Sequence, residues 1–147
     1  MENNNPSRKA GSMAFQGDIG FIRVDEHIEA KLKAKGIDVR KVISDAKNKI
    51  LNPLAKTDRP QEAGFHPEKG MVLAQGESRN HYHAFREPEK VDVFATNDDN
   101  IRLVVMKDTQ SLKHEEHDPI DFEKDEIYVQ GFQFAYDYEE EYSVIAD

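Results

Sequence analysis

The sequence contains no cysteine. This absence excludes disulfide bonds, thiolate zinc sites and a cysteine nucleophile, and it leaves the compartment undetermined by redox chemistry. No apolar run approaches the roughly 20 residues that a membrane-spanning helix needs. The first twelve residues also lack the apolar core of a secretory signal. We therefore expect a cytoplasmic protein with no membrane partner.

Several catalytic motifs are missing as well. The sequence has no Gly-rich phosphate loop, no GxSxG elbow and no Ser-His-Asp order. Nothing in it therefore supports nucleotide hydrolysis or serine hydrolase chemistry.

The length of 147 residues fits one domain, and 37% hydrophobic residues are enough for one core. The net charge of −9 is concentrated in the last third of the chain, where it would repel a phosphate backbone, so we expect no nucleic-acid partner. Lysine and arginine gather at residues 31–49. Such a cluster is typical of an exposed helix. The alternative is electrostatic docking, which would make the protein a homo-oligomer or part of a larger assembly.

A helical part is predicted at residues 25–51, where apolar residues recur at steps of three and four. The pattern is interrupted at residues 36–38, and Asp38 is a candidate N-cap for a second helix that ends at Asn52-Pro53. Residues 52–70, rich in proline and glycine, are expected to form a loop. We interpret residues 25–68 as a helical insertion and residues 1–13 as a flexible polar arm.

The remainder of the chain predicts short strands rich in Val, Ile and Phe. They lie at residues 14–24 (with a bend at Gly17-Asp18), 71–75, 80–86, 91–95, 101–107 and 127–138, with a closing strand at 142–146. Residues 97–100 are a candidate hairpin turn. Short strands with turn residues between them favour a mainly β (α+β) fold, a small barrel or sandwich, in a single domain covering residues 14–147.

The concentrated chemical signal is two histidine pairs, His81-x-His83 and His114-x-x-His117. On a strand, residues i and i+2 point to the same face, so His81 and His83 are expected to project side by side and to share one metal ion. A spacing of three does not share a strand face, so at most one of the second pair joins them unless the chain turns, as Pro119 suggests. The alternatives are solvent-facing strand histidines for the first pair and local turn caps for the second.

Three further residues are candidates for the same site. Glu87 follows His83 by four residues and would add a carboxylate, and Gln133 and Tyr136 on the aromatic strand would bind a ligand. A solvated glutamate and two core or rim positions are the alternatives. Imidazole ligands with one carboxylate favour Zn, Fe, Mn, Ni or Cu over Ca or Mg.

Gly76, the pair His81 and His83, and Glu87 together resemble the first motif of the cupin superfamily, which runs glycine, HxH, glutamate. The gap from glycine to histidine is one residue shorter than usual, and the second cupin motif is not recognisable. The resemblance implies a cupin-like β-barrel that binds a metal ion through histidines.

Longer stretches are similar to a set of small uncharacterised bacterial and phage proteins. The stretches are Gln16-Gly17-Asp18, VLAQGESRNHYH from Val72, LKHEEHDPI from Leu112, QFAY from Gln133 and VIAD from Val144. Arg79-Asn80 and Ala135 depart from the pattern of those proteins. The similarity implies a β fold with metal binding and leaves the reaction open.

Two functions therefore remain in view from the sequence. The first is a metal- or small-ligand-binding domain with a histidine-cluster pocket. The second is a non-enzymatic structural component of a phage virion, or another interaction protein, which the polar arm, the uneven charge and the helical insertion favour.

Overall fold

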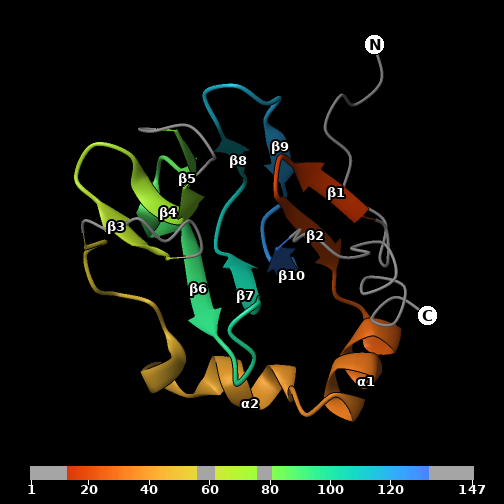
Figure 1. Cartoon of the computed structure of the whole chain (residues 1–147). Coiled ribbons are helices and arrows are strands. Elements are labelled where there is room, and N and C mark those ends of the chain that lie inside the picture. Colours follow the sequence, from red (N-terminus) through yellow and green to blue (C-terminus); the bar gives the residue numbers. More distant parts are fainter. Residues whose placement is uncertain (1–12, 56–61, 76–80, 133–147) are drawn as a thin grey trace.

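The computed structural model describes residues 13–55, 62–75 and 81–132, and in them the chain forms two five-stranded antiparallel sheets (Figure 1). The first sheet has the order β1 (Met13–Gln16), β2 (Ile19–Arg23), β10 (Ile127–Phe132), β7 (Ile101–Met106) and β6 (Val91–Ala95). The second has the order β3 (Gly64–His66), β4 (Gly70–Gln75), β5 (Tyr82–Phe85), β8 (Gln110–Lys113) and β9 (Ile120–Phe122). The expected mainly β class is confirmed.

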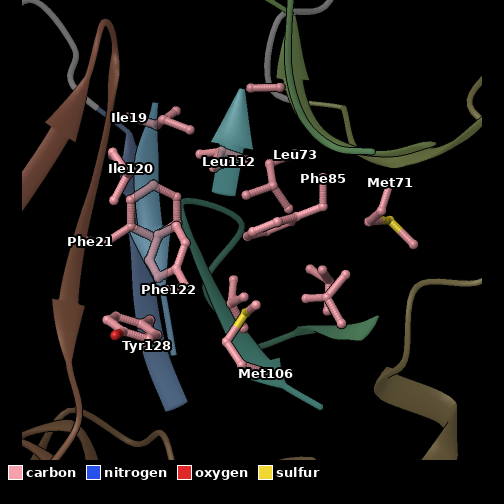
Figure 2. Packing of buried hydrophobic residues seen from close by; sticks show 14 of the residues in the cluster. Ile19, Phe21, Met71, Leu73, Phe85, Met106, Leu112, Ile120, Phe122 and Tyr128 are labelled. Carbon is pink, nitrogen blue, oxygen red and sulfur yellow. The ribbon is translucent and has the colours of Figure 1, made fainter. Parts of the chain in front are cut away.

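The two sheets share one hydrophobic core, to which both contribute alternate residues (Figure 2). Phe122 of β9 lies at its centre. Its ring centre is 5.0 Å from that of Phe21, 4.5 Å from that of Tyr128 and 5.5 Å from that of Phe85, all in edge-on or T-shaped contact. Because Phe21 and Tyr128 belong to the other sheet, these rings join the two layers.

The helices cover the outer face of the first sheet and lie at the bottom of Figure 1. Asp25 caps α1 (Glu26–Ala34) by accepting from Ile28 N at 2.8 Å, and Asp38 caps α2 (Val39–Ser44) by accepting from Lys41 N at 3.2 Å. The buried side chains of these helices pack against Ile22, Leu103 and Val129 and their neighbours. Two 3₁₀ turns, η1 (Ala46–Asn48) and η2 (Pro88–Lys90), complete the helical elements of the described residues.

The predicted helical segment and the Asp38 cap are confirmed, although α2 ends at Ser44 because Asp45 caps the separate turn η1. The single strand predicted at residues 14–24 is a hairpin, since Gly17 at φ +56° reverses the chain between β1 and β2. The expectation of a loop over residues 52–70 is wrong at β3. The strands β8 and β9 were not predicted.

Other predictions extend beyond the described part of the chain. The strand predicted at residues 127–138 is observed as β10 up to Phe132, and its remainder lies outside the described residues. The same holds for the strand at 142–146 and for residues 1–12 of the arm. No helix in the described residues is long and apolar enough to cross a membrane.

Gly70, the first residue of β4, provides a test of the close approach of β4 to β5. Its φ is +95°, and a Cβ there would lie 2.2 Å from the carbonyl oxygen of Phe85. Gly36 has a similar φ of +91°, but the nearest atom to its Cβ position is 3.7 Å away. We expect Gly70→Ala to lower the free energy of unfolding by about 3 kcal/mol, and the matched control Gly36→Ala by about 1 kcal/mol. Urea unfolding measures both, and equal losses would contradict the close approach.

Candidate functional site

The candidate site lies at the end of the two sheets where β1, β5 and the β8–β9 loop meet, opposite the helices (Figure 1). The chain leaves β8 at Lys113, turns through residues 114–119 and re-enters the sheet as β9. That turn brings both members of the second histidine pair to the first pair, which strand geometry alone would not do.

All four predicted histidines gather in this cluster, with His114 in the middle. The ring centre of His114 lies 4.3 Å from that of His83, 4.7 Å from that of His117 and 5.8 Å from that of His81. The rings of His83 and His117 are nearly parallel, with centres 6.3 Å apart. His83 is 1% exposed and His114 is 9% exposed, so the centre of the cluster is buried.

Gln16, at the end of β1, orients the ring of His83. Its Nε2 donates to two backbone carbonyls, those of Leu112 at 3.0 Å and Asp118 at 2.9 Å. Its Oε1 therefore faces Nδ1 of His83, at 2.9 Å. Because an amide oxygen only accepts, Nδ1 of His83 carries the proton, and Nε2 of the neutral ring keeps its lone pair.

The carboxylate of Glu116 does the same for His81. Its Oε1 lies 2.8 Å from Nδ1 of His81, so that nitrogen donates and Nε2 is again left for another partner. Such an oxygen acceptor on the second ring nitrogen is the usual support of a metal-binding histidine. Two of the four imidazoles therefore have the hydrogen bonding of metal ligands.

Glu115 fastens the loop to β5. Its carboxylate accepts from the backbone N of Tyr82 at 2.8 Å and from Nζ of Lys69 at 3.0 Å. Partial burial alone would raise the pKa of this carboxyl group, but these hydrogen bonds outweigh it and lower the pKa to about 2. Glu115 is therefore ionised, and it holds the β8–β9 loop against β5.

His114 has the opposite hydrogen bonding. Its Nδ1 accepts from the backbone N of Glu116 at 3.0 Å, and its Nε2 is buried without a hydrogen-bond partner. Burial, and next the neighbouring His117, lower its pKa, so the ring is neutral at pH 7. With Nδ1 accepting, the proton of the neutral ring is on Nε2.

Gly17 lies directly against the cluster. A Cβ at this position would be 2.8 Å from Nε2 of His117 and 3.3 Å from Cε1 of His83, so any other residue would force the ring of His117 to shift. Gln16, Gly17 and the two glutamates are site residues that sequence reasoning from the histidines missed. The signal that could have found Gln16 and Gly17 was the Gln-Gly-Asp stretch, which contributed to the resemblance alone.

The carboxylate predicted from Glu87 forms its contacts away from the cluster. Glu87 pairs with Nζ of Lys90 at 3.0 Å, and its backbone exchanges hydrogen bonds with the side chain of Gln110. Gln133 and Tyr136 lie outside the described residues. As the side chains stand, no group of three or more His, Cys, Asp or Glu residues in the described ranges is arranged to hold a metal ion.

The fold and the site define a mainly β domain of two antiparallel sheets with a buried histidine cluster at one end. The chain belongs to the family described as Domain of unknown function (DUF8820), whose model matches residues 15–129. The matched span includes Gln16, Gly17 and all four histidines of the cluster. No curated protein and no solved structure matches the chain.

The buried His83 makes the stability of the metal-free protein depend on pH. Burial, and next the neighbouring His114 and His117, lower its pKa from 6.5 to about 3. Below pH 6.5 His83 binds a proton in the unfolded chain but stays neutral in the folded chain. The free energy of unfolding therefore falls as the pH falls. We expect His83 to contribute a slope that approaches about 1.4 kcal/mol per pH unit between pH 6.5 and 5.

Urea unfolding in the presence of a chelator measures this slope. The variant His83→Gln has no titrating group at this position. Its slope should be smaller by about 1.4 kcal/mol per pH unit. An unchanged slope in this variant would show that His83 is not the group responsible.

Proposed function

We propose that the histidine cluster binds a divalent transition metal ion, through Nε2 of His83 together with His81 and His117. The observation that carries the proposal is the hydrogen bond from Nδ1 of the buried His83 to Gln16, which presents the opposite nitrogen as a lone pair inside a cluster of imidazoles. The bond from His81 to Glu116 supports it in the same way.

The spacing of the rings also supports a shared ion. Imidazoles bound through nitrogen at about 2.0–2.1 Å from one ion have ring centres roughly 4.5–6.4 Å apart, depending on the angle between them. Among the proposed ligands, the ring centres of His83 and His117 are 6.3 Å apart, which lies within this range. The rings as they stand in the described residues do not form a metal site, so the proposal includes an adjustment of the ligand side chains when the ion binds.

The available ligands indicate which ion. Glu115 and Glu116 are engaged with Tyr82, Lys69 and His81, so imidazoles are the free donors of the cluster. Imidazole nitrogen suits Zn, Fe and Ni better than Ca or Mg, and Mn is the weakest binder of this series. The proposed function is therefore a metal-binding domain, and the proposal includes no reaction.

Metal binding is tested by elemental analysis and by calorimetric titration of chelator-treated protein with Zn²⁺, Ni²⁺ and Co²⁺ at neutral pH. We expect one ion per chain and a gain in thermal stability. His83→Ala should weaken the affinity by about 100-fold or more, since loss of a supporting residue alone costs about 10–100-fold. The control His27→Ala removes an exposed histidine of α1 and should leave the metal affinity unchanged. Absence of stoichiometric metal in the wild type would refute the function.

The role of Gln16 is tested separately. Gln16→Leu removes the acceptor of His83 and should weaken metal affinity about 10- to 100-fold while His83 itself is still present. Gln110→Leu is the matched control, because that glutamine bonds to the backbone of Glu87 away from the cluster. Equal affinities in the two variants would show that Gln16 does not position the ligand.

A further inference from the structure

The central ring of the cluster, His114, differs from its neighbours in its hydrogen bonding. His81 and His83 each donate from Nδ1 to a side-chain oxygen, whereas Nδ1 of His114 accepts from the backbone N of Glu116 at 3.0 Å. A backbone N–H only donates, so Nδ1 of His114 holds its lone pair there. The neutral ring then carries its proton on Nε2, and an N–H group cannot be a metal ligand.

This Nε2–H group is left without an acceptor. It is buried and has no hydrogen-bond partner, in a side chain that is 9% exposed. A buried donor without a partner costs about 1–3 kcal/mol. The ring centre lies within 4.3–5.8 Å of those of the three proposed ligand histidines, so the unsatisfied donor belongs to the same site.

We propose that His114 is not a ligand of the ion but the hydrogen-bond donor to an anionic oxygen ligand, a carboxylate or small oxyanion, bound to that ion. The inference rests on the proposed metal function and names the class of molecule that the site takes. A metal ion alone would leave the N–H unsatisfied, whereas an oxygen bound to the ion supplies the acceptor.

Two substitutions test the roles of Nδ1 and Nε2 of His114 one at a time. Asparagine can place its amide oxygen near the position of Nδ1, so His114→Asn keeps the bond from Glu116 N and removes the donor. Glutamine can place its amide nitrogen near the position of Nε2, so His114→Gln keeps the donor and removes the bond from Glu116 N. The pair therefore distinguishes donation to a ligand from support of the loop.

The experiment loads each protein with Co²⁺ and follows its visible absorption during titration with acetate and with azide. We expect His114→Asn to bind Co²⁺ within about threefold of the wild type, because no ligand is lost, but to bind both anions at least tenfold more weakly. His114→Gln should keep most of the anion affinity. The matched variant His83→Ala should lose the Co²⁺ itself.

Three results would overturn the inference. Loss of Co²⁺ from His114→Asn to the extent seen in His83→Ala would make His114 a ligand, with the metal function intact. Unchanged anion affinity in His114→Asn would remove its role as donor, again with the metal function intact. Failure of the wild type to bind Co²⁺ would overturn the metal function and this inference together.

Discussion

The site depends on one buried side-chain amide, that of Gln16. Gln16 ends β1 in the first sheet, and its three hydrogen bonds all reach residues associated with the second sheet: His83, Leu112 and Asp118. The amide is 1% exposed, so an unmade hydrogen bond there would leave a buried polar group without a partner. The bonds therefore fix the distance from the β1–β2 hairpin to β5 and to the β8–β9 loop. Glu115 and Glu116 then hold the loop against β5 and orient the ring of His81.

The cluster works against the stability of the domain. The buried His83, His114 and Gln16 lie at the end of a sandwich whose main core is apolar, with Phe122 and its ring contacts at the centre. Well-packed hydrophobic residues in these buried positions would avoid the free-energy cost of desolvating polar groups and would not make stability depend on pH. His83, with its pKa near 3, makes the folded state less stable in mild acid. Fold stability therefore does not account for the choice of residues, and this supports the proposed binding of a metal ion.

The sequence could predict the mainly β class and the helical segment, because each is a pattern within one element. Of the HxH pair, His83 lies in β5, but His81 lies just before that strand and bonds to Glu116 of the β8–β9 loop. The strand β8 was not predictable in this way, since Leu112 is its one buried apolar residue. Three-residue β9 is likewise too short to show a period.

The assembly of the site could not be predicted, because it depends on contacts between distant residues. Gln16 lies 67 residues from His83 and 102 from Asp118 along the chain. No local pattern encodes these bonds. The junction of HxH with HEEH likewise required the β8–β9 turn, which Pro119 only suggested. The pairing of Glu87 with Lys90, one helical turn away, is a local contact that the cupin-like spacing did not indicate.

The two consecutive glutamates of the loop show why an anion suits the proposed site. Glu115 turns toward the backbone of β5 and Lys69, while Glu116 binds His81 with its side chain and His114 with its backbone N–H. Both carboxylates thus hold the loop and the rings in place. The ligands left for an ion are neutral imidazoles, and the carboxylate of Glu116 beside His81 offsets only part of its double positive charge. In a site of low dielectric constant the ion's charge interacts strongly with its surroundings. A negatively charged oxygen ligand would reduce this charge and would also accept the hydrogen bond of His114. The same hydrogen bonds that orient the histidines therefore also favour an anion as the molecule that we propose to complete the site.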